Sequence, residues 1–150
     1  HTRVPKKSCS ALILAPTREL AAQIAVSVHS YGKFVHHSKA LIVGGARMGA
    51  HSKVLARGVY IIVSTPGRLE DHIKCRNLKL DITTCLVLDE ADQMMDLGFF
   101  PAIRRIMDFL PDGHQTLLLS ATMPKLKIFK VLRLESVLSP WRVVSLKLSL

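Results

Sequence analysis

The chain alternates short apolar runs with longer stretches whose apolar residues recur at helical spacing. Each apolar run is short enough to form one buried strand. Together the runs predict five strands, at residues 11–15, 40–43, 59–63, 84–88 and 116–119. Strands that alternate with helices through short loops are typical of an α/β fold with a parallel sheet.

Four stretches between and after these runs predict helices. Residues 20–31 carry apolar side chains at i+3 and i+4 spacing, and Gly32 ends this helix. Residues 48–56 show a weaker version of the same pattern. A third helix begins at Thr65–Pro66, with threonine as the N-cap and proline at the first helical position. Residues 103–110 form the fourth amphipathic stretch.

The last part of the chain has a less distinct pattern. Residues 125–135 fit both helical and alternating spacing, whereas residues 145–150 alternate polar and apolar positions as a strand does. We expect residues 125–150 to continue the domain that residues 1–124 form.

Composition indicates one domain with a basic surface. The 150 residues are 49% hydrophobic, which is enough for a buried core, and the formal net charge is +10 at pH 7. Such a field attracts polyanions, so nucleic acid is the first candidate partner and an anionic membrane surface the second. A basic surface that only contacts solvent is the alternative.

Cysteine and histidine usage gives no sign of a metal or disulfide framework. The three cysteines form no C-x-x-C pair, and their odd number suits a reducing cytoplasm. The seven histidines have no ligand spacing, so we expect them on the surface rather than around a metal. No apolar run approaches the roughly 18 residues that a membrane span needs, and no signal peptide opens the chain.

Four polar motifs follow four of the predicted strands. Ligands of parallel α/β sheets bind beyond the carboxyl ends of the strands, so these motifs are expected along one rim. They are Pro16–Ala21 (PTRELA), Thr65–Arg68 (TPGR), Asp89–Asp92 (DEAD) and Ser120–Thr122 (SAT).

The third motif places two carboxylates at the tip of a buried strand, which holds them in fixed positions. Asp89 could hold Mg²⁺ through its water shell, because Mg²⁺ favours one or two carboxylates together with water and phosphate. Glu90 could orient and deprotonate the water that attacks a phosphoryl group. The alternative is an acidic N-cap on the next helix.

Two other motifs offer anion-binding helix starts. Thr17–Arg18 and Thr65–Arg68 each combine free backbone N–H groups with an arginine, and Gly67 permits a phosphate to approach closely. Such contacts hold a nucleic-acid backbone without reading bases. Either motif could instead be a simple cap beside a solvated arginine.

The remaining candidates are a glycine pair and two hydroxyls. Gly44–Gly45 would let a nucleic-acid strand approach, or would only form a turn. Ser120 and Thr122 could hydrogen-bond Asp92 and so couple two sites, or could only cap a helix after Pro124.

A P-loop is not found in the chain. That loop needs G-x-x-x-x-G-K-[ST], whose lysine meets the β- and γ-phosphates. Gly44 and Gly49 have the glycine spacing, but Ala50 and His51 stand where lysine and serine or threonine are required.

Taken together, PTRELAAQ, the glycine pair, TPGR, DEAD and SAT resemble the DEAD-box RNA helicases in order and spacing, over about residues 10 to 124. The sequences of residues 56–69 and 88–100 are most similar to the bacterial RhlE-type branch. The resemblance implies a RecA-like, three-layer parallel sheet of the P-loop NTPase type, in incomplete form. It also implies an ATP- and Mg²⁺-dependent enzyme that clamps single-stranded RNA between two RecA-like lobes and opens short duplexes in the cytoplasm.

The resemblance implies a role for each matching residue. Asp89 and Glu90 serve Mg²⁺ and the hydrolytic water, and Asp92 with Ser120 and Thr122 links hydrolysis to unwinding. The residues expected to contact the RNA backbone, with little sequence preference, are Thr17, Arg18, Gly45, Thr65, Gly67 and Arg68.

The same resemblance sets expectations about what lies outside the chain. The Q motif and P-loop are expected upstream, and the second RecA-like lobe with its arginine finger downstream. The fragment alone is expected to be inactive, and loss of the P-loop strand is expected to expose a sheet edge and favour aggregation. The alternatives are a non-enzymatic RNA-binding fragment and a DNA translocase of the same superfamily.

Overall fold

The structure, a computed structural model, describes residues 3–122 and the backbone of residues 143–147. In these residues six parallel strands form one sheet, in the order β2-β3-β1-β4-β5-β6. The strands are β1 (Cys9–Leu14), β2 (Lys39–Ile42), β3 (Val59–Ser64), β4 (Cys85–Leu88), β5 (Gln115–Ser120) and β6 (Val143–Lys147). Every neighbouring pair is parallel, which confirms the predicted α/β class.

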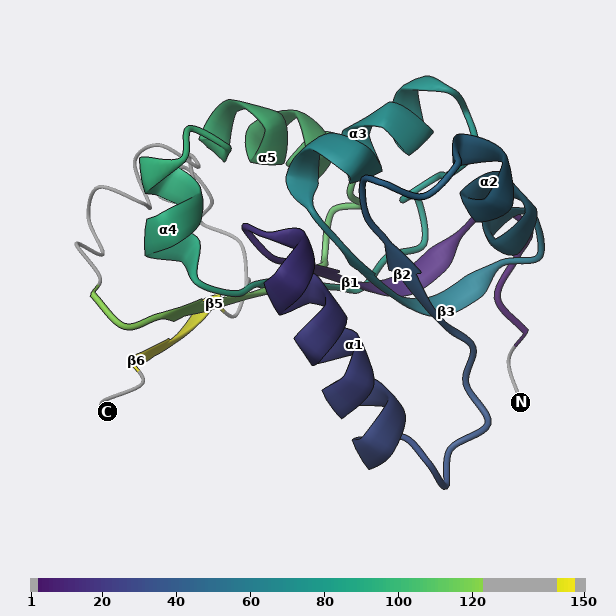
Figure 1. Cartoon of the computed structure of the whole chain (residues 1–150), viewed down its shortest axis with the longest axis horizontal. Helices are drawn as coiled ribbons and strands as arrows, with labels where there is room; N and C mark the ends of the chain where they lie inside the picture. The colour runs from purple at the N-terminus through teal and green to yellow at the C-terminus, as the bar shows by residue number, and fades with distance from the viewer. Residues whose placement is uncertain (1–2, 123–142, 148–150) are drawn as a thin grey trace.

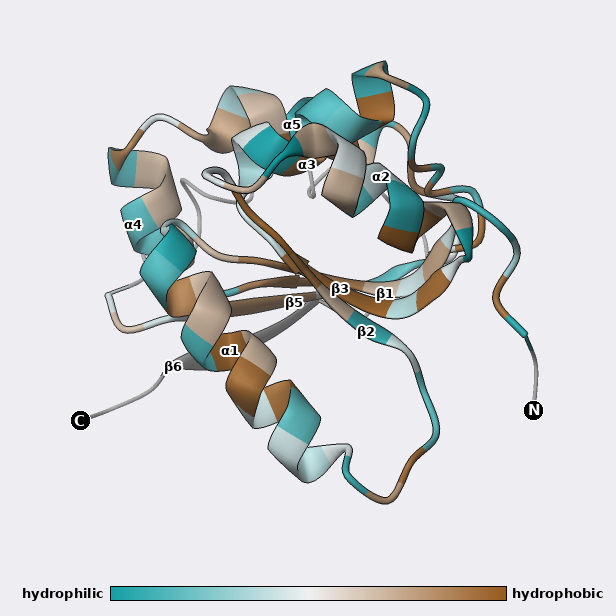
Figure 2. Ribbon diagram, turned by 45° about the vertical axis from the view of Figure 1, so that its right-hand side comes forward, coloured by the Kyte–Doolittle hydropathy of each residue, from teal (hydrophilic) through white to brown (hydrophobic). Residues whose placement is uncertain are grey.

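Helices cover both faces of the sheet (Figure 1). They are α1 (Arg18–Tyr31), α2 (Met48–Ala56), α3 (Pro66–Lys74), α4 (Ala91–Asp96) and α5 (Phe100–Met107). Helix α1 lies on one face, while α2, α3 and α5 lie on the other, as Figure 2 shows. The result is the three-layer arrangement that the sequence predicts.

The core is divided between these two faces. The larger cluster packs the buried side chains of α2 to α5 against the sheet, with Leu12, Leu86 and Leu88 fully buried at its centre. The smaller cluster packs α1 onto the opposite face through Ala21 and Val63. Strands buried on both faces read as continuous apolar runs, which explains why β1, β3 and β4 are visible in the sequence.

The differences from the predicted elements are small. Helix α2 begins and ends where its pattern predicts, and the ends of β1 to β5 shift by at most two residues. Helix α5 begins and ends three residues earlier than its pattern predicts. Helix α4 is not predicted as a separate element, because six residues are too few for a periodic pattern. The ambiguous residues 125–135 lie outside the described part of the chain.

One strand in the tail changes the expected sheet edges. Residues 143–147 form β6, which begins two residues before the predicted alternation and ends three residues before its end. Strand β6 pairs with β5 from Thr116↔Val143 to Ser120↔Lys147. Strand β5 therefore has a neighbour on each side, and the edge strands of the described sheet are β2 and β6.

Candidate active site

The parallel sheet brings the sequence motifs to one rim. The register pairs Leu14 with both Ser64 and Leu88, and Leu88 with Leu118, so the carboxyl ends of these strands lie level. The segments that follow them are Thr17–Arg18 after β1, Gly44–Gly45 after β2, Thr65–Arg68 after β3, Asp89–Asp92 after β4 and Ser120–Thr122 at the end of β5. The predicted rim is confirmed.

Asp89 continues the ladder of β4 by one residue. Its backbone N–H donates to the Leu14 carbonyl at 3.0 Å, which fixes the residue against β1. Its carboxylate Oδ1 accepts the Glu90 N–H at 2.9 Å. Among the described residues the second oxygen accepts no hydrogen bond, and the residue is half-buried, so this oxygen has an acceptor position left for another donor.

Glu90 has an unusual backbone conformation for its residue type. With φ 49° and ψ 52° it lies in the left-handed helical region, which costs a non-glycine residue about 1–2 kcal/mol. Although Glu90 occupies the N-cap position of α4, its side chain makes no capping hydrogen bond and is exposed. The simple N-cap alternative is therefore not what holds the carboxylate here, and strain of this kind is typical of functional positions.

Asp92 joins the acidic motif to the end of β5. Its Oδ2 accepts the Thr122 hydroxyl at 2.6 Å, and its Oδ1 accepts the Gln93 N–H at 3.0 Å. Burial acts to raise the pKa of Asp92, but hydrogen bonds, first from Thr122, outweigh it and lower that pKa below its usual value. Ser120 also lowers the pKa, although its buried hydroxyl makes no hydrogen bond of ordinary geometry to a described residue. The hydrogen bond that connects Asp92 to the segment after β5 therefore comes from Thr122.

The segments after β1 and β2 contact each other. Thr17 caps α1, because its hydroxyl accepts the Leu20 N–H at 3.1 Å. The Arg18 side chain lies over the glycine pair: a Cβ on Gly45 would come within 3.0 Å of Arg18 Nη1. Gly45 has φ +90°, so glycine is needed there both for the turn and for the contact with the arginine.

The TPGR segment is tied to the same glycine turn. The Arg68 guanidinium donates through Nη2 to the Ala46 carbonyl, and its Nε is buried without a partner among the described residues. Thr65 stands at the N-cap of α3 and Pro66 at its start, as predicted, but the Thr65 hydroxyl makes no capping bond. A Cβ on Gly67 would meet nothing within 4 Å, which leaves open space above the helix start.

A buried histidine pair lies behind this turn and is not predicted from the sequence. His72 is fully buried and His51 nearly so, which makes the prediction of surface histidines wrong for both. His72 Nε2 lies 3.4 Å from His51 Nδ1, and the Asn77 amide lies 3.2 Å from His72 Nδ1. Burial, followed by nearby charge that includes Arg68, lowers the pKa of both histidines. The available signal is the position of His72 three residues after Leu69, on the buried face of α3.

The carboxylates fit a magnesium ion that is shared with water and phosphate. No group of three or more potential metal ligands occurs in the described part of the chain. Mg²⁺ does not require one, since it keeps several waters and takes one or two carboxylates. The second carboxylate oxygen of Asp89, which accepts no hydrogen bond from a described residue, and the exposed Glu90 match that demand.

Comparison with known proteins agrees with this geometry. The sequence profile of the DEAD/DEAH box helicases matches residues 2–129. The chain is 48% identical over 114 residues to "DEAD-box ATP-dependent RNA helicase 46" of Arabidopsis thaliana, covering 76% of this chain and 18% of that protein. It is also 48% identical over 114 residues to "ATP-dependent RNA helicase DBP2" of Candida albicans, covering 76% of this chain and 20% of the relative.

A solved structure has the same fold. A Saccharomyces cerevisiae Dbp5 variant bound to Nup159, a Gle1 variant, IP6 and ADP is similar with a TM-score of 0.76 and 31% sequence identity, over 94% of this chain and 36% of that one. These relatives come from a plant and from yeasts, so they give no support to the bacterial RhlE-like branch. The chain spans about a fifth of the length of the curated relatives. With its fold, its rim of motifs and its profile match in agreement, the chain belongs to the DEAD/DEAH box helicase family.

Proposed function

We propose that this chain is the catalytic midsection of an ATP-dependent RNA helicase that couples ATP hydrolysis to local opening of RNA duplexes. The observation that carries the proposal is the Asp92–Thr122 hydrogen bond of 2.6 Å, which connects the carboxylates after β4 to the end of β5. The names of the relatives support the substrate class, since they are ATP-dependent RNA helicases.

The two leading carboxylates have separate roles in this proposal. Asp89, fixed by Leu14 and by the Glu90 N–H, would hold Mg²⁺ through water at its second carboxylate oxygen. Glu90, exposed and without a competing hydrogen bond among the described residues, orients the attacking water and takes its proton. When bound, Mg²⁺ neutralises the charge that develops on the phosphates.

The RNA contacts are proposed along the rim beside these carboxylates. The N-termini of α1 and α3 carry positive partial charge, and the glycines at 45 and 67 leave room for a sugar-phosphate backbone. Thr17, Arg18, Thr65 and Arg68 complete the proposed contact set. The Arg68 guanidinium donates to the Ala46 carbonyl, so it also holds the glycine turn in place.

The nucleotide needs further groups that this chain does not contain. The Q motif, the P-loop and a second RecA-like lobe are proposed to come from the rest of the protein, and the cytoplasm is the proposed location. Within the described residues, no helix has both the length and the apolar character of a membrane span. The 150-residue chain alone is expected to show no measurable ATP hydrolysis.

The proposal is tested in the full-length protein with three variants. Glu90→Gln should lower RNA-stimulated ATP hydrolysis by roughly 100-fold or more, because the water loses its base. Thr122→Val should preserve most hydrolysis and lose duplex unwinding, because it removes the bond to Asp92. Asp81→Asn is the matched control: it removes an exposed carboxylate near the opposite end of β4 and should change neither rate.

Different results would favour the alternatives. If Glu90→Gln leaves hydrolysis unchanged while RNA binding remains salt-sensitive and weakens in Arg18→Ala, the chain is an RNA-binding module and not a motor part. If the full-length protein opens DNA duplexes as readily as RNA duplexes, the RNA assignment is wrong.

A further inference from the structure

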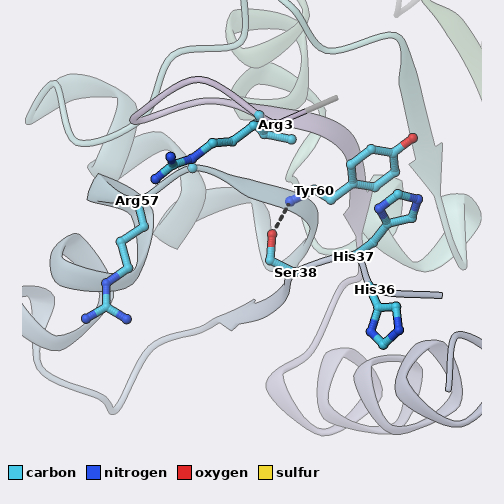
Figure 3. A pocket seen from close by; sticks show the side chains of 8 residues that line it. Arg3, His36, His37, Ser38, Arg57 and Tyr60 are labelled. Atoms are coloured by element: carbon cyan, nitrogen blue, oxygen red, sulfur yellow. Dashed lines mark hydrogen bonds between the residues drawn. The ribbon is translucent and has the colours of Figure 1, made fainter. Parts of the chain in front are cut away.

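Two adjoining hollows lie at the amino ends of β2 and β3, at the opposite end of the sheet from the motif rim. The first has a volume of about 320 Å³. Its lining includes Arg3, His36, His37, Ser38, Arg57 and Tyr60, whose side chains are drawn in Figure 3. The second is about 280 Å³ and includes Ser38, Lys39, Lys53 and Arg57. Along β3, from Val59 to Ser64, the two ends of the sheet are about 16 Å apart at roughly 3.3 Å per residue.

Ser38 lines both hollows and is fixed by backbone hydrogen bonds. The Ser38 carbonyl accepts the N–H groups of Tyr60 at 3.0 Å and Ile61 at 3.1 Å. The Ser38 hydroxyl oxygen accepts the Tyr60 N–H at 3.0 Å, a bond that is dashed in Figure 3. Because Ser38 Oγ acts there as acceptor, its own O–H remains available to donate to an anion.

Gly58 allows the amino-terminal segment, whose Arg3 and Val4 line the first hollow, to pack closely against it. It has φ +80°, and a Cβ at this position would lie 2.6 Å from the Val4 carbonyl oxygen and 2.4 Å from that of Pro5. The adjoining backbone is also fixed, since the Lys7 N–H donates to the Leu55 carbonyl at 3.1 Å. The segment that carries Arg3 is therefore packed against the sheet through close backbone contacts.

Both hollows are lined by positively charged side chains and by no negatively charged one. Neither is lined by an aspartate or glutamate, and within the described part of the chain Arg3, Arg57 and Lys53 form no ion pair. Lys39 donates to the Gly32 carbonyl at 3.0 Å, which leaves its charge uncompensated. Each hollow thus contains at least two cationic side chains, with Arg57 shared between them.

Aromatic rings stand beside these charges. His37 stacks on Tyr60 with ring centroids 3.8 Å apart and planes inclined by 5°. The loop that supplies His36 and His37 also exposes Phe34, whose side chain is 89% accessible. Cationic grooves flanked by exposed aromatic rings are the usual means of binding single-stranded nucleic acid without sequence preference.

We propose that these hollows form a second nucleic-acid site, separate from the motif rim, in which successive backbone phosphates of single-stranded RNA occupy the two hollows. A single free phosphate would use only one of them, whereas a strand uses both together with the Ser38 hydroxyl and an exposed ring. This second site would hold an RNA strand at the end of the sheet opposite the motif rim, where the first set of RNA contacts is proposed.

The test measures binding of a fluorescein-labelled 12-nucleotide oligouridylate to the full-length protein by anisotropy, without ATP, from 50 to 200 mM salt. Lys53→Gln/Arg57→Gln should weaken binding and lower the slope of log affinity against log salt by roughly 1.4, about 0.7 for each phosphate that is no longer neutralised. Lys79→Gln/Arg104→Gln removes the same charge elsewhere and should leave the slope unchanged. Equal losses in both pairs would mean a general field effect and would overturn the site.

Further measurements distinguish RNA from other anionic ligands, and this second site from the motif rim. Phe34→Ala should lower affinity about fivefold or more without changing the salt slope, since stacking is uncharged. Saturation of the site by inorganic phosphate alone, or equal competition by phosphatidylserine vesicles, would overturn the assignment to nucleic acid. Arg68→Ala combined with Lys53→Gln/Arg57→Gln should give additive losses in log affinity, because the two sites share no residue. Strong non-additivity would show that the motif rim and the hollows act as one site and would overturn the proposal of a separate one.

Discussion

The left-handed backbone conformation of Glu90 predicts that this residue lowers the free energy of unfolding of the chain. At φ 49° and ψ 52° a residue with a Cβ costs about 1–2 kcal/mol, which Glu90→Gly would remove. Glycine loses about 0.5–1 kcal/mol more backbone entropy on folding. The net expectation is a gain of roughly 0.5–1 kcal/mol in the free energy of unfolding, or roughly 1–4 °C in Tm for a chain of this size.

The chain contains a matched control. Arg76 also has a positive φ, 57°, and is exposed, but it lies outside the motif rim. Arg76→Gly should therefore raise stability by a similar amount and leave ATP hydrolysis unchanged. Glu90→Gln keeps the strained backbone and changes only an exposed carboxylate, so its stability should stay within about 0.5 kcal/mol of the original.

Urea denaturation and thermal melting of all three variants give the stabilities, and RNA-stimulated ATP hydrolysis by the full-length protein gives the functional readout. We expect Glu90→Gly to be the most informative variant, more stable and yet inactive. A loss of stability in Glu90→Gly beside a gain in Arg76→Gly would refute the reasoning, because it would show that the Glu90 side chain stabilises the fold by more than its backbone conformation costs.

Two further predictions concern buried titratable groups. Burial raises the pKa of the Cys9 thiol to about 11, so a thiol reagent at pH 8 should label exposed Cys75 within minutes and Cys9 only after unfolding; rapid labelling of Cys9 in the folded chain would contradict its burial. Because the folded state lowers the pKa values of His51 and His72 below 6.5, the stability that they contribute is complete above pH 6.5 and is lost as pH falls through their lowered folded values. Urea denaturation at pH 7.5, 6.0 and 5.0 should show a slope of up to about 1.4 kcal/mol per pH unit for each histidine, and His72→Asn should flatten it. A profile that is flat in the original chain would contradict the assignment.

The sequence predicts the fold well because its signals are local. Apolar runs with turn residues at their ends identify β1, β3 and β4, since strands covered by helices on both faces must be apolar throughout. The common rim then follows from parallel pairing alone, and so does the closeness of Asp92 to Thr122.

Other features depend on long-range packing that no window of sequence contains. The hydrogen bond from Arg68 to the Ala46 carbonyl spans 22 positions, so the sequence could not show that this arginine, predicted to contact RNA or to be solvated, also holds the glycine turn. The burial of His51 against His72 likewise requires α2 and α3 to lie side by side. The conformation of Glu90 is also invisible locally, because its left-handed φ is imposed by the elements on either side of it.

Those elements explain how the strain persists and how it is compatible with the role proposed for Glu90. On one side the Asp89 N–H is bonded to Leu14 in β1, and on the other the Glu90 carbonyl accepts the Met94 N–H at 3.0 Å at the start of α4. Both anchors rest on fully buried side chains of the larger core, so relaxing the backbone between them would break a hydrogen bond worth about 1 kcal/mol and would also displace Leu14 or Met94 from the core. The positions of the two leading carboxylates are therefore set by backbone, whereas the Asp92 side chain bonds Thr122, which follows β5 in the described part of the chain. A displacement of the end of β5 would be transmitted to α4 through Thr122 and would leave Asp89 where β1 holds it.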